Sequence, residues 1–273
     1  MTDSNEAIVD TYQIKDRRFH EEVSAFTLKI CTPIYWHDRD MPFPKEVRGA
    51  SCFMLRFGEQ IVGVTANHVI EEYKQALSCT PTLVCQLRML PFNLEDAIID
   101  ADRELDIATF RLSKNQLSQI EGIAVDCTRQ WPPPVPEHMR AISFAGFPEA
   151  IRRVNHLDRS AEFLAYGALT CVESISEREI LTVYDPKIAR QLAGCARMPP
   201  LRFNMSGCSG GPVLIHGERN GLHRWFPVGL IIAGPGMKSD GETQAFDMVR
   251  LRRIHFIQPD GRISHPSTGW LPV

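Results

Sequence analysis

The sequence predicts an all-β protein in which two β units are separated by a proline-rich linker. The 273-residue chain contains nineteen prolines and eighteen glycines among many short β-branched runs, a composition typical of strands joined by tight turns. The segment 131–136 holds four of those prolines. Proline at this density excludes both a helix and a central strand, so we expect an extended linker there.

The first unit is expected to contain alternating strands and one helical segment. Residues 51–57 and 60–65 flank Gly58-Glu59, which is a hairpin turn signal. Residues 71–77 favour one or two helical turns. Residues 25–31 alternate between apolar and polar side chains like a half-buried strand. The strands expected in this unit are, in order, 25–31, 51–57, 60–65, 83–90 and 105–112.

The second unit is expected to repeat this β-rich pattern after the linker. Its last segment, 250–257, is predicted to be a short C-terminal helix. The strands expected before it are 139–145, 163–172, 180–184, 211–215 and 226–232.

The segment Met205–Val213 carries the strongest chemical signal, because it places Ser209 inside Gly-x-Ser-Gly-Gly-Pro. Gly207 allows the backbone to turn so that successive N–H groups point at one spot, an arrangement that holds the oxygen of a tetrahedral intermediate. Gly210 and Gly211 remove side chains from around the serine. A serine in this setting still needs a base and a group that orients the base.

A histidine and an aspartate in fitting contexts precede this serine. His68 follows an apolar alternating run in Ala66-Asn67-His68, a context that the other eight histidines lack. Asp106 competes with Asp100 and Asp102, which lie in a polar stretch where we expect them to be solvated. Asp106 is flanked by leucine and isoleucine in an expected strand, and a carboxylate in apolar surroundings needs a partner such as an imidazole N–H.

The three motifs Ala-x-His, Asp-Ile-Ala and Gly-x-Ser-Gly-Gly-Pro occur in the order His, Asp, Ser. Together they give the chain a resemblance to the trypsin-like (chymotrypsin-fold) serine peptidases, of the compact bacterial type without a PDZ domain. The resemblance covers residues 24–258. Three motifs in order are far more specific than any one of them alone.

The resemblance implies a fold of two six-stranded antiparallel β-barrels, with the active site in the cleft between them and a short C-terminal helix. His68 and Asp106 would belong to the first barrel and Ser209 to the second. The implied division is an N-terminal arm 1–23, a first barrel 24–130, a linker 131–136, a second barrel 137–258 and a C-terminal tail 259–273.

The resemblance also implies roles for individual residues. His68, Asp106 and Ser209 would form the catalytic triad, with the backbone N–H groups of Gly207 and Ser209 as the oxyanion hole. Phe203 stands where trypsin carries its specificity aspartate, which favours an uncharged P1 residue. The segment Ile232-Ala233-Gly234 would bind substrate backbone and form one wall of the pocket. No cofactor or metal is expected.

Cys208 departs from the pattern of zymogen-type relatives, which carry an aspartate at this position. A thiol cannot pair with a newly cut N-terminal ammonium, so we do not expect activation by N-terminal cleavage. Viral relatives use cysteine as the nucleophile, which makes Cys208 a second candidate, but the register of the motif selects Ser209.

Composition narrows the setting in which such a protein would work. A net charge of −3 gives no support for a nucleic-acid partner. No apolar segment approaches membrane-spanning length, and we expect no secretory signal peptide. The eight cysteines are expected to be free thiols in a reducing cytoplasm.

The function expected from these features is a serine endopeptidase that acts on protein or peptide substrates. Two alternatives remain open at this stage. One is a catalytically silent peptide-binding module of the same fold. The other is an effector protease that is active only with a regulatory protein partner.

Overall fold

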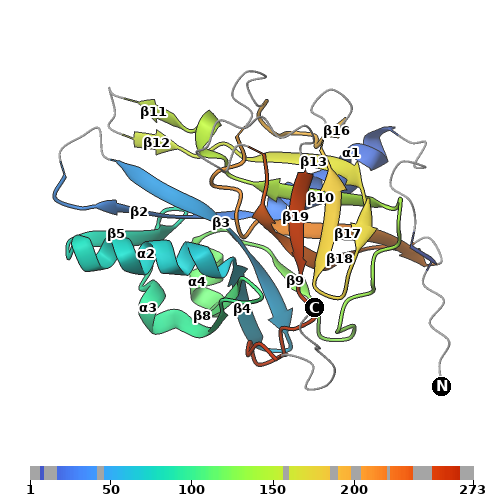
Figure 1. The fold of residues 1–273 in the computed structure, drawn as a ribbon, viewed down its shortest axis with the longest axis horizontal. Coiled ribbons are helices and arrows are strands. Elements are labelled where there is room, and N and C mark those ends of the chain that lie inside the picture. The colour runs from blue at the N-terminus through green and yellow to red at the C-terminus, as the bar shows by residue number, and fades with distance from the viewer. Residues whose placement is uncertain are drawn as a thin grey trace.

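The computed structural model describes residues 7–8, 17–41, 46–155, 160–184, 190–197, 204–219, 222–235 and 248–264. Within these residues the protein is mostly β, with two large sheets that are almost entirely antiparallel. Figure 1 shows the sheet of the first half on the left, with helix α2 (Asn67–Cys79) beside it, and the sheet of the second half on the right. The prediction of an all-β protein is confirmed at this level.

The first sheet has eight strands in the described residues. Its path is β6-β5-β2-β3-β4-β8-β7, and β9 joins β3 in the one parallel pairing recorded there. Its strands are β2 (Thr32–Asp38), β3 (Val47–Phe57), β4 (Gln60–Thr65), β5 (Leu83–Leu87), β6 (Leu90–Pro91), β7 (Ile98–Asp102), β8 (Ile107–Leu112) and β9 (Ala124–Asp126). The short helices α3 (Leu94–Ala97) and α4 (Lys114–Gln119) lie on either side of β7 and β8 in the chain.

The second sheet has nine strands in the described residues. Its path is β14-β15-β19-β18-β17-β10-β13-β16, with β1 paired to β17. Its strands are β1 (Ala7–Ile8), β10 (Ala141–Gly146), β13 (Tyr166–Cys171), β14 (Ser174–Ile175), β15 (Glu179–Val183), β16 (Arg190–Gln191), β17 (Pro212–Arg219), β18 (Leu222–Ala233) and β19 (Met248–Arg253). A separate pair joins β11 (Arg153–Asn155) to β12 (Ser160–Glu162) after a short 3-10 helix, η2 (Glu149–Ile151).

The hairpin predicted around Gly58 is confirmed as the β3–β4 pair. Gly58 has a φ of +61°, the left-handed conformation that a two-residue hairpin turn requires. Phe53 and Val64 face each other across this pair and are fully buried. The hairpin leads the chain from Thr65 directly into α2, and this places His68 just beyond the end of β4.

One of the apolar clusters is shared by the two halves, which explains how residues distant in sequence come together. The larger buried cluster contains side chains of the first sheet and also Leu214, Leu230 and Ile254 of the second half. Burial of side chains this size stabilises the folded state by about 1.5–3 kcal/mol each. The junction between the halves is therefore packed, and a site built there has rigid support on both sides.

The prediction of a strand over 25–31 is wrong, because these residues end helix α1 (Arg17–Ile30). Thr27 and Ile30 are buried at the three-residue spacing of one helix face, and Cys31, directly after the helix, is buried as well. The Thr27 hydroxyl lies 2.6 Å from the Ser143 hydroxyl on β10, and α1 packs against β10, β13 and β17. Apolar spacing in so short a segment fits both periods, and packing on the second half selected the helix.

The predicted C-terminal helix over 250–257 is also wrong, since Met248–Arg253 forms β19 between β15 and β18. Val249 and Leu251 are buried whereas Arg250 is exposed, which is the two-residue period of a strand. Residues 254–257 continue without a helix.

Other predictions on architecture have mixed outcomes. The recorded pairings give open paths of strands, so two closed six-stranded barrels remain a prediction. The segment 131–136 contains no helix or strand. All eight cysteines are described, and each is a free thiol. No helix among the described residues is long and apolar enough to cross a membrane.

Candidate active site

His68 and Asp106 lie against each other at the start of α2. The His68 ring nitrogen Nδ1 is 2.9 Å from Asp106 Oδ2 and 3.1 Å from Oδ1, and the His68 backbone N–H donates to Oδ1 at 2.9 Å. A carboxylate can only accept here, so Nδ1 carries the proton and Nε2 is left as the basic nitrogen. The pair is therefore held in the tautomer that a general base needs.

Asp106 occupies a strained turn rather than the strand expected from the sequence. Strand β8 begins one residue later, at Ile107, and Asp106 has a φ of +54°. This conformation is uncommon outside glycine, although aspartate tolerates it better than most residues. The Leu105 N–H donates to Asp102 Oδ1 at 2.7 Å and shapes this turn. The strained backbone thus aims the carboxylate at the histidine.

The competing carboxylates have structural duties instead. Asp100 Oδ2 accepts the Ile263 N–H at 2.8 Å, and Asp102 closes the turn described above. Neither forms a hydrogen bond to His68 in the described residues. Both side chains are therefore held by hydrogen bonds, whereas we expected them to be solvated. Asp106 is the partner of His68, as predicted.

The environment of His68 moves its pKa in two directions. Burial lowers the pKa by penalising the imidazolium, whereas the hydrogen bond and charge of Asp106, helped by the charges of Glu72 and Glu71, raise it. The carboxylates outweigh burial, and the net pKa lies above the ordinary value of 6.5. The imidazolium that forms during proton transfer is therefore stabilised by its surroundings.

The loop that carries Ser209 depends on glycine at two positions. Gly207 has a φ of +91°, and a Cβ there would lie 2.5 Å from the Phe147 carbonyl oxygen. Gly210 has a φ of +82°, and its Cβ would lie 2.2 Å from both the Ser51 carbonyl oxygen and the Thr65 hydroxyl. A side chain at either position would clash with backbone as well as strain the turn. The sequence motif is thus explained by close approach of three chain segments.

Ser51 on β3 holds this loop to the first sheet, and it was missed in the sequence. Its hydroxyl donates to the Gly207 carbonyl oxygen at 2.8 Å and accepts the Phe147 N–H at 2.9 Å. Its backbone N–H donates to the Ser209 carbonyl oxygen at 2.9 Å. Ser51 is fully buried. No sequence motif identifies Ser51, because its hydrogen bond to Gly207 forms only when segments 156 residues apart meet in the fold.

Two N–H groups of the serine loop, those of Gly207 and Ser209, are directed by the hydrogen bonds of the carbonyls that precede them. The Ser206 carbonyl accepts the Glu149 N–H at 2.8 Å, and the Cys208 carbonyl accepts the Gly211 N–H at 2.9 Å. In a trans peptide the N–H points opposite to the C=O, so the N–H groups of Gly207 and Ser209 point away from those partners. Neither N–H donates a hydrogen bond within the described residues.

A close contact between neighbouring residues brings the Ser209 loop near the segment that carries His68. Ser209 is buried, and a Cβ on the next residue, Gly210, would lie 3.0 Å from the backbone nitrogen of Ala66, two residues before the histidine. Both Ser209 and His68 are described, and no hydrogen bond joins their side chains. In unliganded enzymes such bonds are often long and tighten only around substrate.

Comparisons with known proteins give no family for this chain. No family model matches it, and no curated protein matches it. The resemblance to trypsin-like peptidases therefore rests on the three motifs in the sequence and stays a prediction.

Cys208 is packed into the core of the second half. It is fully buried, and a Cβ on Gly146 would lie 2.8 Å from its sulfur. Burial raises the pKa of this thiol well above its ordinary value, and the neighbouring Cys31 contributes in the same direction. The thiol is therefore protonated and shielded, whereas a nucleophilic cysteine needs an exposed thiolate.

The predicted substrate-binding residues are only partly described. Ile232 is buried in the shared core, and Ala233 and Gly234 at the end of β18 are partly exposed. This strand is tied to the serine loop, because the Gly210 N–H donates to the Ile231 carbonyl at 2.8 Å. Phe203 lies outside the described residues. Within the described chain, no three His, Cys, Asp or Glu side chains gather as a metal site would require.

Proposed function

We propose that the protein is a serine endopeptidase that hydrolyses peptide bonds with His68, Asp106 and Ser209. The observation that carries this proposal is the paired hydrogen bonding of Asp106 to His68 Nδ1, beside a serine loop in which the N–H groups of Gly207 and Ser209 donate no hydrogen bond within the described residues. A base, the group that orients it and donors for an oxyanion are the parts that acyl transfer needs.

In the first half of the proposed reaction, Ser209 Oγ attacks the carbonyl carbon of the scissile peptide. His68 Nε2 takes the hydroxyl proton, and Asp106 stabilises the resulting imidazolium. The carbonyl oxygen becomes an oxyanion that accepts hydrogen bonds from the N–H groups of Gly207 and Ser209. The C–N bond then breaks, and His68 returns the proton to the leaving amine.

In the second half, water replaces the amine and hydrolyses the ester between substrate and Ser209. His68 takes a proton from the water and delivers it to Ser209 Oγ as the ester bond breaks. The products are a carboxylic acid and the free serine. Each step uses only protein groups and water, and the proposal requires no cofactor or metal.

The remaining features of the proposal follow the resemblance. They are two six-stranded barrels with the site between them, an uncharged P1 residue, a protein or peptide substrate and a cytoplasmic location. The partly exposed end of β18 at Ala233 and Gly234, tied to the serine loop, supports its proposed role in binding substrate backbone.

Hydrolysis of a peptide library tests the proposal and reports the P1 residue at the same time. We expect cleavage by the wild-type protein and loss of cleavage in Ser209→Ala. Cys208→Ser serves as the matched control one residue away and should keep activity once its folding has been checked. Activity that survives in Ser209→Ala and disappears in Cys208→Ser would assign the nucleophile to the cysteine.

The absence of a Ser209–His68 hydrogen bond in the described site favours two alternatives. One is a silent peptide-binding module, and the other is a protease that a regulatory partner completes. Cleavage that appears only when cell lysate is added, and that Ser209→Ala abolishes, would establish the partner-dependent enzyme. Peptide binding without cleavage under either condition would establish the binding module.

A further inference from the structure

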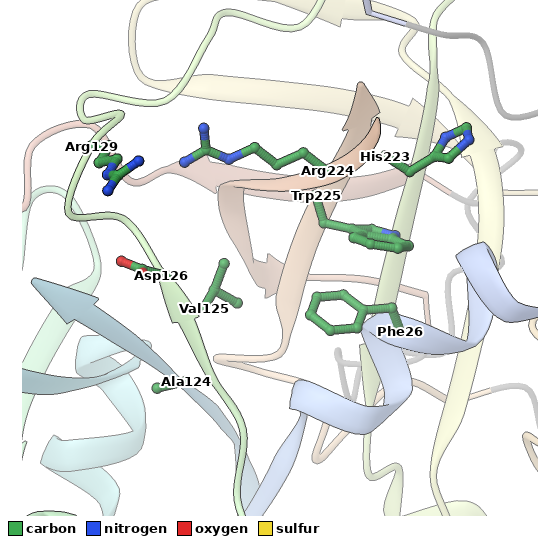
Figure 2. Close-up of a pocket in the computed structure, with 8 residues that line it drawn as sticks. All are labelled: Phe26, Ala124, Val125, Asp126, Arg129, His223, Arg224 and Trp225. Carbon is green, nitrogen blue, oxygen red and sulfur yellow. The ribbon is translucent and has the colours of Figure 1, made fainter. Parts of the chain in front are cut away.

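A pocket of about 440 Å³ lies where β9, β18 and α1 meet (Figure 2). Its lining includes Val125 of β9, Trp225 of β18 and Phe26 of α1. Trp225 and Ile232 lie on the same strand, seven residues apart, a separation of roughly 23 Å along an extended chain. The pocket is therefore distinct from the proposed active site.

One side of this pocket is aromatic. The ring centroids of Phe26 and Trp225 are 4.6 Å apart with an interplanar angle of 33°, and both side chains are partly exposed. Figure 2 shows the two rings together on one side of the pocket, with Val125 beside them. Stacking a flat ring against such residues is favourable and tolerates many kinds of ring.

The other side of the pocket is basic. Figure 2 shows the Arg224 side chain extending in the direction of Arg129. Arg224 Nη1 donates to the uncharged Gln130 Oε1 at 2.5 Å, and its guanidinium lies 5.2 Å from the centre of the Phe226 ring. Among the described side chains, no carboxylate forms an ion pair with Arg129 or Arg224. Two positive charges are therefore left to face the pocket.

The acidic residue on the pocket wall does not cancel these charges. Asp126 accepts the Thr128 N–H at 3.0 Å and pairs with Arg56 at 2.7 Å. Its hydrogen bonds from Thr128, followed by the Arg56 interaction, lower the pKa of Asp126 to about 2. Its charge is thus matched by Arg56, and the excess of positive charge in the pocket comes from Arg129 and Arg224.

We propose that this pocket binds a phosphate monoester that carries an aromatic ring, a class of small molecules that includes aryl phosphates and nucleoside monophosphates. The ring would lie against Trp225 and Phe26, and the phosphate would sit between Arg129 and Arg224. Guanidinium groups match phosphate oxygens in two-pronged hydrogen bonds, and a dianion suits two of them. The pocket is large enough for one such ligand.

Isothermal titration calorimetry with 1-naphthyl phosphate tests the proposal on the whole 273-residue chain. We expect one bound ligand per chain, with affinity that falls as salt is raised. Arg129→Gln and Arg224→Gln should each weaken binding by roughly tenfold, the loss of one charge-assisted interaction. Arg153→Gln removes an exposed arginine on β11 and should bind as the wild type does. Thermal melts of all variants establish that they are folded.

Two further arms make the result decisive. 2-Naphthoate, with one charge, should bind more weakly than the phosphate, and 1-naphthol should bind more weakly still. Ser209→Ala should bind 1-naphthyl phosphate normally, so that the outcome is independent of the proposed peptidase activity. Equal affinity for the phosphate and the naphthol, or unchanged binding in both arginine variants, would overturn the proposal.

Discussion

Ser51 provides a sharp test of how the two halves build the site, because Ser51→Ala removes one oxygen atom from a buried position. That oxygen donates to the Gly207 carbonyl and accepts the Phe147 N–H, at 2.8 and 2.9 Å. Both backbone groups would be left buried without a partner, at a cost of about 1–3 kcal/mol each. We expect a loss of about 3 kcal/mol in the free energy of unfolding.

This loss has two readouts. A decrease of this size in a chain of 273 residues lowers Tm by roughly 6–12 °C, measurable by differential scanning calorimetry. The same change releases the carbonyl of Gly207, the residue whose N–H is one of the two proposed oxyanion donors. Removing such a donor outright costs about 10²–10³ in rate, so loosening it should lower kcat/KM by roughly 10- to 100-fold at temperatures where the variant is folded.

Ser143→Ala is the matched control, since Ser143 is also a buried serine whose hydroxyl pairs with a distant side chain, that of Thr27. It should lose about 1–2 kcal/mol of stability and keep its kcat/KM. The reasoning would be refuted by a Ser51→Ala protein with wild-type kcat/KM, or by equal losses of activity in the two variants.

Three further predictions concern other residues of the proposed active site. Asp106→Asn should reduce kcat/KM by about 10³–10⁴-fold with little change in peptide binding, whereas the exposed control Asp96→Asn should match wild type. Gly210→Ala should lose more than 3 kcal/mol in the free energy of unfolding, measured in urea, and should be inactive, because its Cβ would meet Ser51 and Thr65. The control Gly58→Ala, with a φ of +61° and open space around its Cβ, should lose only about 1 kcal/mol. The acidic limb of the kcat/KM profile should have its midpoint above pH 6.5, since His68 must be neutral to act as the base and its pKa is raised; a midpoint below 6.5 would contradict the assigned environment.

The raised pKa of His68 also has a consequence for stability. A group whose pKa is higher in the folded state stabilises that state fully below its unfolded pKa, and the contribution is lost as pH rises through the folded pKa. The His68–Asp106 pair should therefore stabilise the protein more at pH 6 than at pH 9. Comparing urea unfolding of wild type and His68→Gln across this range measures the effect.

The sequence predicted those parts of the protein in which one local rule applied. The β3–β4 hairpin was predicted from a glycine turn between alternating strands. The need for glycine at position 210 was predicted from a motif whose spacing is strict. The pairing of His68 with Asp106 was predicted because an isolated carboxylate in apolar surroundings needs a partner.

The errors arose where distant contacts decided the outcome. Residues 25–31 suit either a strand or a helix, and the bond from Thr27 to Ser143 accompanies the helix that formed. Met248–Arg253 forms a strand because it pairs with β15 on one side and with β18 on the other. Ser51 could not be found at all, since the three partners that tie it to the second half come from segments about 100 residues or more further along the chain.

The central claim is that Ser209 is a nucleophile activated by His68. Its most direct test is reaction with a fluorophosphonate probe, followed by intact mass and peptide mapping to find the modified residue. The account predicts one adduct per chain, on Ser209, that disappears in Ser209→Ala and is strongly slowed in His68→Ala. An unmodified wild-type protein, or an adduct that persists in Ser209→Ala, would contradict it.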